Sequence, residues 1–137
     1  MFNLLWEPKR HVLLVRFSDV LTFQDYADVD RAIIEFASRR GHADIIYDFS
    51  KTTAVAVPQG GFAFWRQQPP ISVDCNRIFV APRDDLHEEA LEIARQQVQL
   101  GFRRPHVTKS IDEAFQLLQI GKPFFELVLP ADHFESR

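Results

Sequence analysis

The sequence predicts an α/β domain with a mainly parallel sheet, an antiparallel hairpin at its N-terminus and helices packed on the sheet. Two apolar runs, at 2–6 and 11–17, precede any helical pattern and predict the hairpin. Two short segments, at 43–49 and 77–81, are apolar throughout, which is typical of strands covered on both faces. The stretches that follow these two strands are long enough for crossover connections, and such connections join parallel strands.

The first helix has the clearest pattern in the chain. A four-residue turn with a proline is predicted at 7–10, between the two strands of the hairpin. After Asp19 the spacing between apolar residues changes to three and four, which predicts an amphipathic helix. Thr22 is its expected N-cap, with acidic Asp25 three residues later, and Gly41 is expected to end it. Its expected apolar face consists of Phe23, Tyr26, Val29, Ile33, Phe36 and Ala37.

Three further helices and one more strand are predicted after the first helix. A helix over 58–68 has a proline in its first turn, although two glycines weaken it. A helix is expected over 84–101, capped by Asp84, and a short strand over 105–109. A capping box predicts the last helix, over 110–120. The expected inward face of the helix over 84–101 consists of Leu86, Ala90, Ile93, Ala94 and Val98.

The length of 137 residues and the mass of 15.9 kDa fit one hydrophobic core. The predicted order is β-β-α-β-α-β-α-β-α in a single domain at 1–122, followed by a C-terminal tail at 123–137. A net charge of −3 provides no basic surface for a phosphate backbone, so we expect no nucleic acid as a partner. The single cysteine excludes a disulfide framework, and the scattered histidines lack metal-motif spacing. We therefore expect neither a metal nor a cofactor.

The start of the chain has no signal-like segment. Charged residues at 7–10 interrupt it, and no apolar stretch in the chain is long enough to span a membrane. The expected location is therefore the cytoplasm.

The predicted hairpin and the ends of three later strands together match the pattern of a known family. The matching segments are the initial hairpin, Ile45-Ile46-Tyr47-Asp48-Phe49-Ser50 with its D-x-S end, Arg77-Ile78-Phe79-Val80-Ala81-Pro82, and Val107-Thr108-Lys109-Ser110 followed by Asp112-Glu113-Ala114. With this pattern the chain resembles, over residues 2–120, a STAS-type domain of the SpoIIAA-like families, named after an anti-sigma-factor antagonist. The resemblance implies a STAS-like fold and a non-catalytic, regulatory module that binds a protein partner or a small ligand.

The resemblance also implies a binding face, formed by the loop after Phe49 and the helix that follows. Polar loop residues there would position a ligand or a partner backbone, and aromatic residues would bury contact area. The residues of this face are Asp48, Ser50, Lys51, Thr52, Thr53, Phe62 and Trp65. Phosphorylation-switched members carry a hydroxyl residue at the start of that helix, whereas 56–59 contains none. The usual phosphoacceptor is therefore absent, although Ser50, Thr52 and Thr53 remain open to modification.

Strand-end carboxylates support an alternative function. The carboxyl ends of parallel strands share one edge of a sheet, where ligands bind. A small hydrolase or lyase would use Asp48 as a base and His106 or Lys109 as an electrophile. A receiver-like phosphoswitch would use acidic strand-end residues with the same lysine. The chain contains no recognisable catalytic motif, so the binding module remains the main prediction and no catalytic residue is assigned.

The aromatic residues exceed what one core needs. Phe62, Phe64 and Trp65 are spaced so that they cannot all face one side of a helix. The tail adds further apolar residues beyond the last predicted helix. It either packs back onto its own domain, is disordered, or forms an interface with a partner or a second copy, since leftover apolar surface marks interfaces. The candidate interface residues of the tail are Phe124, Phe125 and Leu127, and a homodimer is one expected assembly.

Overall fold

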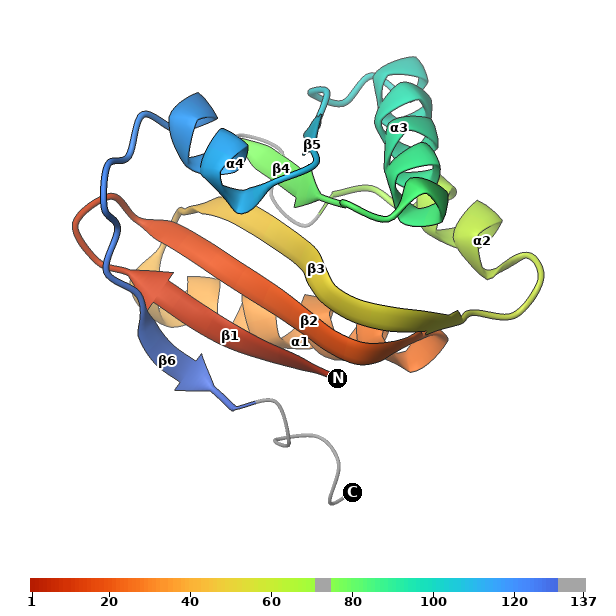
Figure 1. Cartoon of the computed structure of the whole chain (residues 1–137). Coiled ribbons are helices and arrows are strands. Elements are labelled where there is room, and N and C mark those ends of the chain that lie inside the picture. The colour runs from red at the N-terminus through yellow and green to blue at the C-terminus, as the bar shows by residue number, and fades with distance from the viewer. Residues whose placement is uncertain (71–74, 131–137) are drawn as a thin grey trace.

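The centre of the fold is a six-stranded sheet with the strand order β5-β4-β3-β2-β1-β6 (Figure 1). The structure is a computed structural model that describes residues 1–70 and 75–130. The strands are β1 (Phe2–Glu7), β2 (Val12–Thr22), β3 (Asp44–Ala56), β4 (Arg77–Val80), β5 (His106–Thr108) and β6 (Glu126–Leu129). The helices are α1 (Phe23–Arg40), α2 (Gly61–Gln67), α3 (Asp84–Gln99) and α4 (Ile111–Leu117).

The pairing of the strands confirms the predicted fold class. β1 pairs antiparallel with β2 as the expected hairpin, from Phe2 opposite Phe17 to Glu7 opposite Val12. β2, β3, β4 and β5 pair parallel in that order, so each helix between β2 and β5 lies in a crossover connection. The predicted order of elements is therefore correct from β1 to α4, and a further strand, β6, follows.

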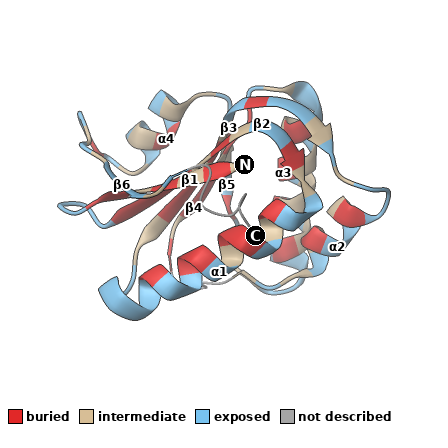
Figure 2. Cartoon of the chain, turned by 90° about the horizontal axis from the view of Figure 1, so that it is seen from below, coloured by how far each residue is buried: buried red, intermediate tan, exposed pale blue. Residues whose placement is uncertain are grey.

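Two hydrophobic clusters cover the two faces of the sheet. Alternate residues of β2 point to opposite faces, as strand geometry requires. Leu13 and Val15 belong to the cluster that includes α1, Trp65 of α2 and Leu86 of α3. Val12 and Leu14 belong to the other cluster, with Ala114 of α4. Figure 2 shows α1 across the sheet, with buried and exposed residues alternating along it. Three helices therefore cover one face, and α4 covers part of the other.

The ends of α1 form as the sequence predicts. The Thr22 hydroxyl accepts from the backbone N–H of Asp25 at 3.3 Å, and the Asp25 carboxylate accepts from the backbone N–H of Thr22 at 2.8 Å. Together these two bonds make a capping box. Gly41 ends the helix with a φ of 83°, in the region that favours glycine. The strongest helical pattern in the sequence is therefore confirmed at both ends.

The residues after Phe49 form a strand rather than the predicted loop. β3 runs to Ala56, and its last residues pair with the end of β2, where Thr22 lies opposite Ala56. Register shifts interrupt this pairing near Ser18 and Val20. The polar residues of the predicted loop occupy a twisted edge of the sheet, because parallel pairing satisfies their backbone groups.

Two helix predictions also need correction. α2 begins at Gly61, three residues after the proline at which it was expected to start. Arg83, not Asp84, is the N-cap of α3, and Asp84 is its first helical residue. Val98 is 48% exposed rather than inward, and Gln97 is buried in its place. A difference of one position around a helix changes which residue faces the sheet, and only the packing decides it.

Part of the predicted tail belongs to the sheet. β6 pairs antiparallel with β1, from Leu4 opposite Leu129 to Trp6 opposite Glu126. Phe125, just before β6, packs against the cluster under α4 and stacks on Phe115 at a centroid distance of 6.0 Å. Of the three possibilities for the tail, this segment packs back onto its own domain. Residues 131–137 lie outside the described residues. No helix in the described ranges is long and apolar enough to cross a membrane.

Candidate functional site

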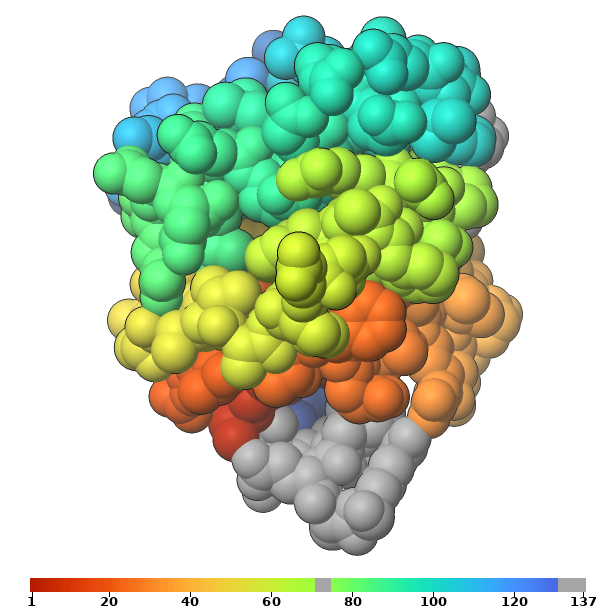
Figure 3. All heavy atoms as spheres, turned by 90° about the vertical axis from the view of Figure 1, so that its right-hand side faces the viewer, coloured from red at the N-terminus to blue at the C-terminus, as the bar shows by residue number. Residues whose placement is uncertain are grey.

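A cavity of about 100 Å³ lies between the sheet and the three helices that cover it. Strands β2, β3 and β4 form its floor, and α1, α2 and α3 form its sides. In the space-filling view, α2 fills the gap between α3 and the start of α1 (Figure 3). The short helix that the sequence marked as weak therefore closes the cavity from outside.

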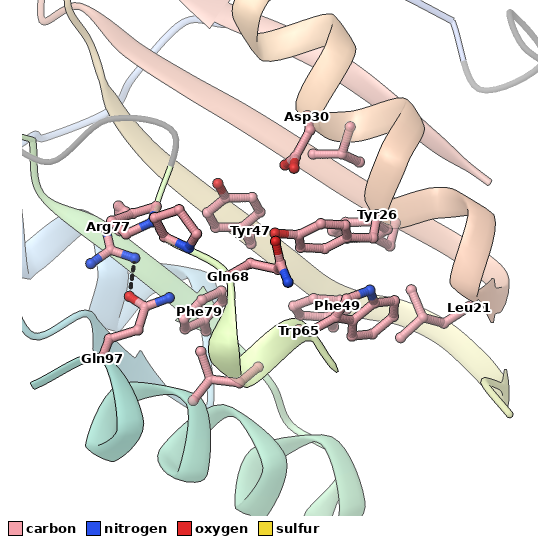
Figure 4. Close-up of a pocket in the computed structure, with 15 residues that line it drawn as sticks. Leu21, Tyr26, Asp30, Tyr47, Phe49, Trp65, Gln68, Arg77, Phe79 and Gln97 are labelled. Atoms are coloured by element: carbon pink, nitrogen blue, oxygen red, sulfur yellow. Dashed lines mark hydrogen bonds between the residues drawn. The ribbon is translucent and has the colours of Figure 1, made fainter. Parts of the chain in front are cut away.

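Six of the 15 residues that line the cavity are aromatic (Figure 4). Phe17 of β2 stacks on Phe49 of β3 with ring centroids 4.5 Å apart and an interplanar angle of 2°. Tyr47 stacks on Phe79 of the next strand at 5.2 Å. Strand alternation places Tyr47 and Phe49 on the same face, and parallel pairing places Phe79 beside Tyr47. The sheet thus presents a continuous aromatic floor, on which an apolar ligand would bury its surface.

Trp65 connects the floor to α1. Its ring stacks on Tyr26 at 5.4 Å and on Phe23 at 5.7 Å, while Phe62 meets it edge-on at 5.1 Å. Trp65 is 8% exposed, and its indole N–H has no hydrogen-bond partner among the described residues. A buried donor without a partner costs free energy. The cavity wall at Trp65 therefore carries an indole N–H donor that no described residue uses.

One end of the cavity opens at Tyr26, Asp30 and Gln68. These three residues line both the cavity and a groove on the outside, between α1 and α2. Burial raises the pKa of Asp30 to about 6, and a hydrogen bond from the Tyr26 hydroxyl partly opposes this rise. The pKa of Tyr26 is raised as well, mainly by burial and then by the Asp30 charge. The mouth of the cavity therefore carries a carboxyl group that titrates close to neutral pH.

The cavity also contains a buried positive charge. Arg77 is 5% exposed, although it belongs to an otherwise apolar strand. Its guanidinium donates to the side-chain oxygen of Gln97 and, at 2.6 Å, to the backbone oxygen of Arg103. Burial lowers the pKa of Arg77. Figure 4 shows Arg77 and Gln97 together, on the side of the cavity away from Leu21.

Two contacts hold α2 over the cavity: an ion pair with α3, and the close packing of Gly61 against Val57 and Phe23. Arg66 makes a two-pronged bond with Glu89 of α3, with both N–O distances at 2.5 Å. At the start of α2, a Cβ on Gly61 would lie 2.5 Å from Val57 and 3.2 Å from Phe23. Glycine allows this helix to lie tightly against the strand and α1.

The predicted binding residues divide into two groups in space. Asp48 is 3% exposed and accepts from the backbone N–H of Ser50 at 2.9 Å and from its hydroxyl. Arg16 lies 3.5 Å from the Asp48 carboxylate. Because strand residues alternate, Asp48 belongs to the face opposite Tyr47 and Phe49. The structure therefore brings Asp48 and Ser50 together, but on the other side of the sheet from the cavity.

The remaining predicted binding residues lie at the end of β3 and on α2. Lys51 and Thr53 are exposed, whereas Thr52 is 6% exposed and its hydroxyl has no partner among the described residues. Trp65 lines the cavity, and half-buried Phe62 packs behind it. Of the whole predicted set, Trp65 is the member that lines the cavity.

No hydrogen bond or ion pair among the described residues joins the members of the alternative enzyme site. Lys109 lies 3.6 Å from Asp84, and both side chains are exposed. His106 lines a separate hollow beside α3. In the described part of the chain, Asp48 forms no hydrogen bond or ion pair with Lys109 or His106. Over the same part, no three His, Cys, Asp or Glu side chains could hold a metal ion.

The candidate interface residues of the tail differ in exposure. Phe124 is 75% exposed and Leu127 is 59% exposed, whereas Phe125 is half-buried against Phe115. Phe124 and Leu127 thus lie on the surface around β6, the edge strand of the sheet.

Sequence reasoning missed the polar groups of the cavity: Tyr26, Asp30, Tyr47, Gln68, Arg77 and Gln97. Arg77 did carry a signal, because a lone charge in a strand buried on both faces needs a reason. Tyr26 and Asp30, four residues apart, share one side of a helix. Gln97 carried no such signal, because a glutamine on an amphipathic helix is ordinarily exposed.

Comparisons with known proteins identify the fold. No protein-family model matches the chain, and no curated protein matches it. A solved structure of the anti-sigma factor antagonist SpoIIAA in its unphosphorylated form is similar to it, with a TM-score of 0.52 and 20% sequence identity. The similarity covers 87% of this chain and 98% of that chain. The chain therefore has the predicted STAS-like fold, which is the fold of SpoIIAA.

Proposed function

We propose that this chain is a non-catalytic, regulatory module that binds a small molecule in the cavity under α2. The observation that supports this function best is the cavity itself, with several aromatic residues and a few polar groups in its lining. Small-molecule sites are concave, mostly apolar and carry a few polar groups that orient the ligand. The likeness to SpoIIAA supports a regulatory role, because that protein is an antagonist of another regulator.

The lining residue Ile93 allows the proposed function to be tested by filling the cavity. Ile93 faces the cavity from α3, whereas Leu91 on the same helix is 41% exposed and lies outside it. Small neutral, acidic and basic aromatic fragments would be titrated against the full chain while backbone amide shifts are followed by NMR. We expect at least one fragment to shift amides of Tyr47, Trp65 and Phe79 in the unmodified chain and in Leu91→Phe.

In Ile93→Phe the same shifts are expected to disappear, because the larger ring occupies the ligand's volume. The spectrum of each variant without fragment reports whether it is folded. If no fragment of any class shifts the lining amides, or if the shifts persist in Ile93→Phe, the cavity is not a ligand site.

A second candidate function is the binding of a protein partner beside the cavity. Three apolar side chains are exposed around the groove between α1 and α2: Phe23 at 38%, Ile34 at 56% and Phe64 at 47%. Exposed apolar patches of this kind mark interaction surfaces. Lys51 and Thr53 are exposed at the end of β3, the strand that leads to α2. SpoIIAA, as an anti-sigma factor antagonist, supports this kind of partner.

Site-specific crosslinking in the source cell tests the second function. A photoreactive phenylalanine analogue would replace Phe64, and in a control it would replace Val98, which is 48% exposed on α3. We expect one discrete protein adduct at Phe64 and none at Val98. Equal adducts at both positions, or none at either, would show that the groove is not a specific protein interface.

A further inference from the structure

The charge of Arg77 has no anionic partner in the described part of the chain. Its two hydrogen-bond acceptors, Gln97 and the backbone of Arg103, are both neutral. None of the ion pairs among the described residues includes it. Burying a charge without a counter-ion is costly, and neutral acceptors offset only part of that cost. The cavity therefore contains a cation whose charge the described protein does not neutralise.

Arg77 and Asp30 differ in how they can relieve the cost of burial. The two groups form no ion pair with each other. Asp30 is half-buried at the mouth, where solvent screens its charge, and it takes up a proton only below about pH 6, the value to which burial raises its pKa. A guanidinium keeps its charge at any physiological pH, and no described residue forms an ion pair with Arg77, so an added anion would neutralise it. At neutral pH both groups are mainly charged, but the charge of Arg77 is more deeply buried and less screened, which favours an anionic ligand beside it over a cationic one.

The walls of the cavity define the rest of the ligand. Apart from its polar residues, the lining includes Phe79, Ile93, two prolines and the stacked rings of Phe17 and Phe49. A cavity of about 100 Å³ is somewhat smaller than an engineered cavity of roughly 150 Å³ that binds benzene. The body of the ligand is therefore apolar and no larger than one ring or a short alkyl chain.

We propose that the cavity binds small apolar carboxylates, with the carboxylate held by Arg77 and Gln97 and the apolar body lying against the aromatic floor. This inference rests on the proposed ligand-binding function and names the class of ligand. Arginine retains unused N–H donors after its bonds to Gln97 and Arg103, and paired N–H groups match the geometry of a carboxylate. Gln97 also presents an amide N–H group at the same end.

Three ligands of similar size test whether the cavity selects a ligand by its charge. Benzoate, benzamide and benzylamine share a ring and differ in being anionic, neutral and cationic. Their dissociation constants would be measured on the unmodified full chain by NMR titration at neutral pH. We expect benzoate to bind at least tenfold more tightly than benzamide and benzylamine. Equal or tighter binding of either of the other two would overturn the assignment of carboxylates.

Failure of this inference can be distinguished from failure of the proposed function. If benzamide or another uncharged fragment shifts the lining amides and loses this effect in Ile93→Phe, the cavity is a ligand site but not one for carboxylates. If no fragment binds, both proposals are wrong. Binding of benzylamine alone would show that Asp30, not Arg77, holds the ligand.

Variants at Arg77 separate ligand recognition from a purely structural role. Arg77→Met removes the charge but keeps an apolar chain of similar reach, and Arg77→Lys keeps the charge. We expect Arg77→Met to weaken benzoate at least tenfold and to change benzamide less than twofold, with partial recovery in Arg77→Lys. A structural role would weaken both ligands alike. If Arg77→Met does not fold, the comparison of the three ligands on the unmodified chain still decides the question.

Discussion

At the scale of single residues, Asp30 is the clearest source of pH dependence. Its pKa in the folded chain is about 6, against an ordinary value of 3.8. The folded state therefore binds a proton more tightly than the unfolded state between these values. The free energy of unfolding is expected to fall as pH rises through this window, since protonated Asp30 is the form that burial favours.

Asp30→Asn is expected to remove this dependence. It should raise the free energy of unfolding at pH 7, where Asp30 in the folded chain is charged, and have little effect at pH 4, where it is protonated. The expected gain at pH 7 is about 1 kcal/mol, because solvent at this half-buried site screens part of the effect. Urea unfolding at both pH values measures the difference. Glu35→Gln, an exposed carboxylate on the same helix, is the control and should change stability little at either pH. Equal effects of both substitutions at pH 7 would contradict the assigned role of burial.

Thr52 provides a second prediction at this scale. Its hydroxyl is buried and has no hydrogen-bond partner among the described residues. Thr52→Val keeps the branched shape that suits a strand and removes the unpaired polar group, so we expect a gain of about 1 kcal/mol in the free energy of unfolding. Thr53→Val, at the neighbouring exposed position, is the control and should have little effect. A loss of stability in Thr52→Val would indicate that the hydroxyl has a partner, such as a bound water.

At the scale of elements, the position of α2 depends on Gly61. An alanine Cβ there would come within 2.5 Å of the Val57 side chain. Although alanine favours helices, this overlap is larger than the propensity gain, so Gly61→Ala is expected to destabilise the chain by about 1–2 kcal/mol. The shift of α2 should also change the fluorescence of Trp65. Gly121→Ala, where a Cβ meets nothing within 4 Å, should leave both stability and fluorescence unchanged.

The helix and strand that the sequence predicted least well share a physical cause. α2 and β6 are short, with 7 and 4 residues, so their formation depends on what they pack against. α1, with 18 residues and caps at both ends, carries enough local signal to be predicted from sequence alone. β3 extends beyond its apolar part because β2 offers a parallel partner, which its polar residues did not indicate.

At the scale of the whole molecule, β6 is the edge strand that a second copy would meet. Phe124 and Leu127 are exposed beside it, and an exposed strand edge with apolar side chains favours pairing with another chain. We expect light scattering to give about twice the chain mass of 15.9 kDa, and Phe124→Ser/Leu127→Ser to give the monomer mass. Val98→Ser, an exposed position on α3, serves as the control. A monomer at high concentration in the unmodified chain would contradict self-association through β6.

The sequence by itself determined the fold class, the order of elements from β1 to α4 and the capping of α1. These features follow from local periodicity, chain punctuation and the rules of parallel connections, all of which are visible along the chain. Trp65 was among the functional candidates because it belongs to the binding face that the resemblance to STAS-type domains implies.

Only the tertiary structure decided where the candidate site lies. Tyr26 and Asp30 from α1, Arg77 from β4 and Gln97 from α3 are distant in sequence and meet because three helices pack on one face of the sheet. Strand alternation separates Asp48 from Tyr47 and Phe49, but only the packing of the three helices decided that the cavity lies on the face of Tyr47 and Phe49. Among the described residues Arg77 is buried without an anionic partner, and this depends on every neighbour around it, which no local pattern in a sequence encodes.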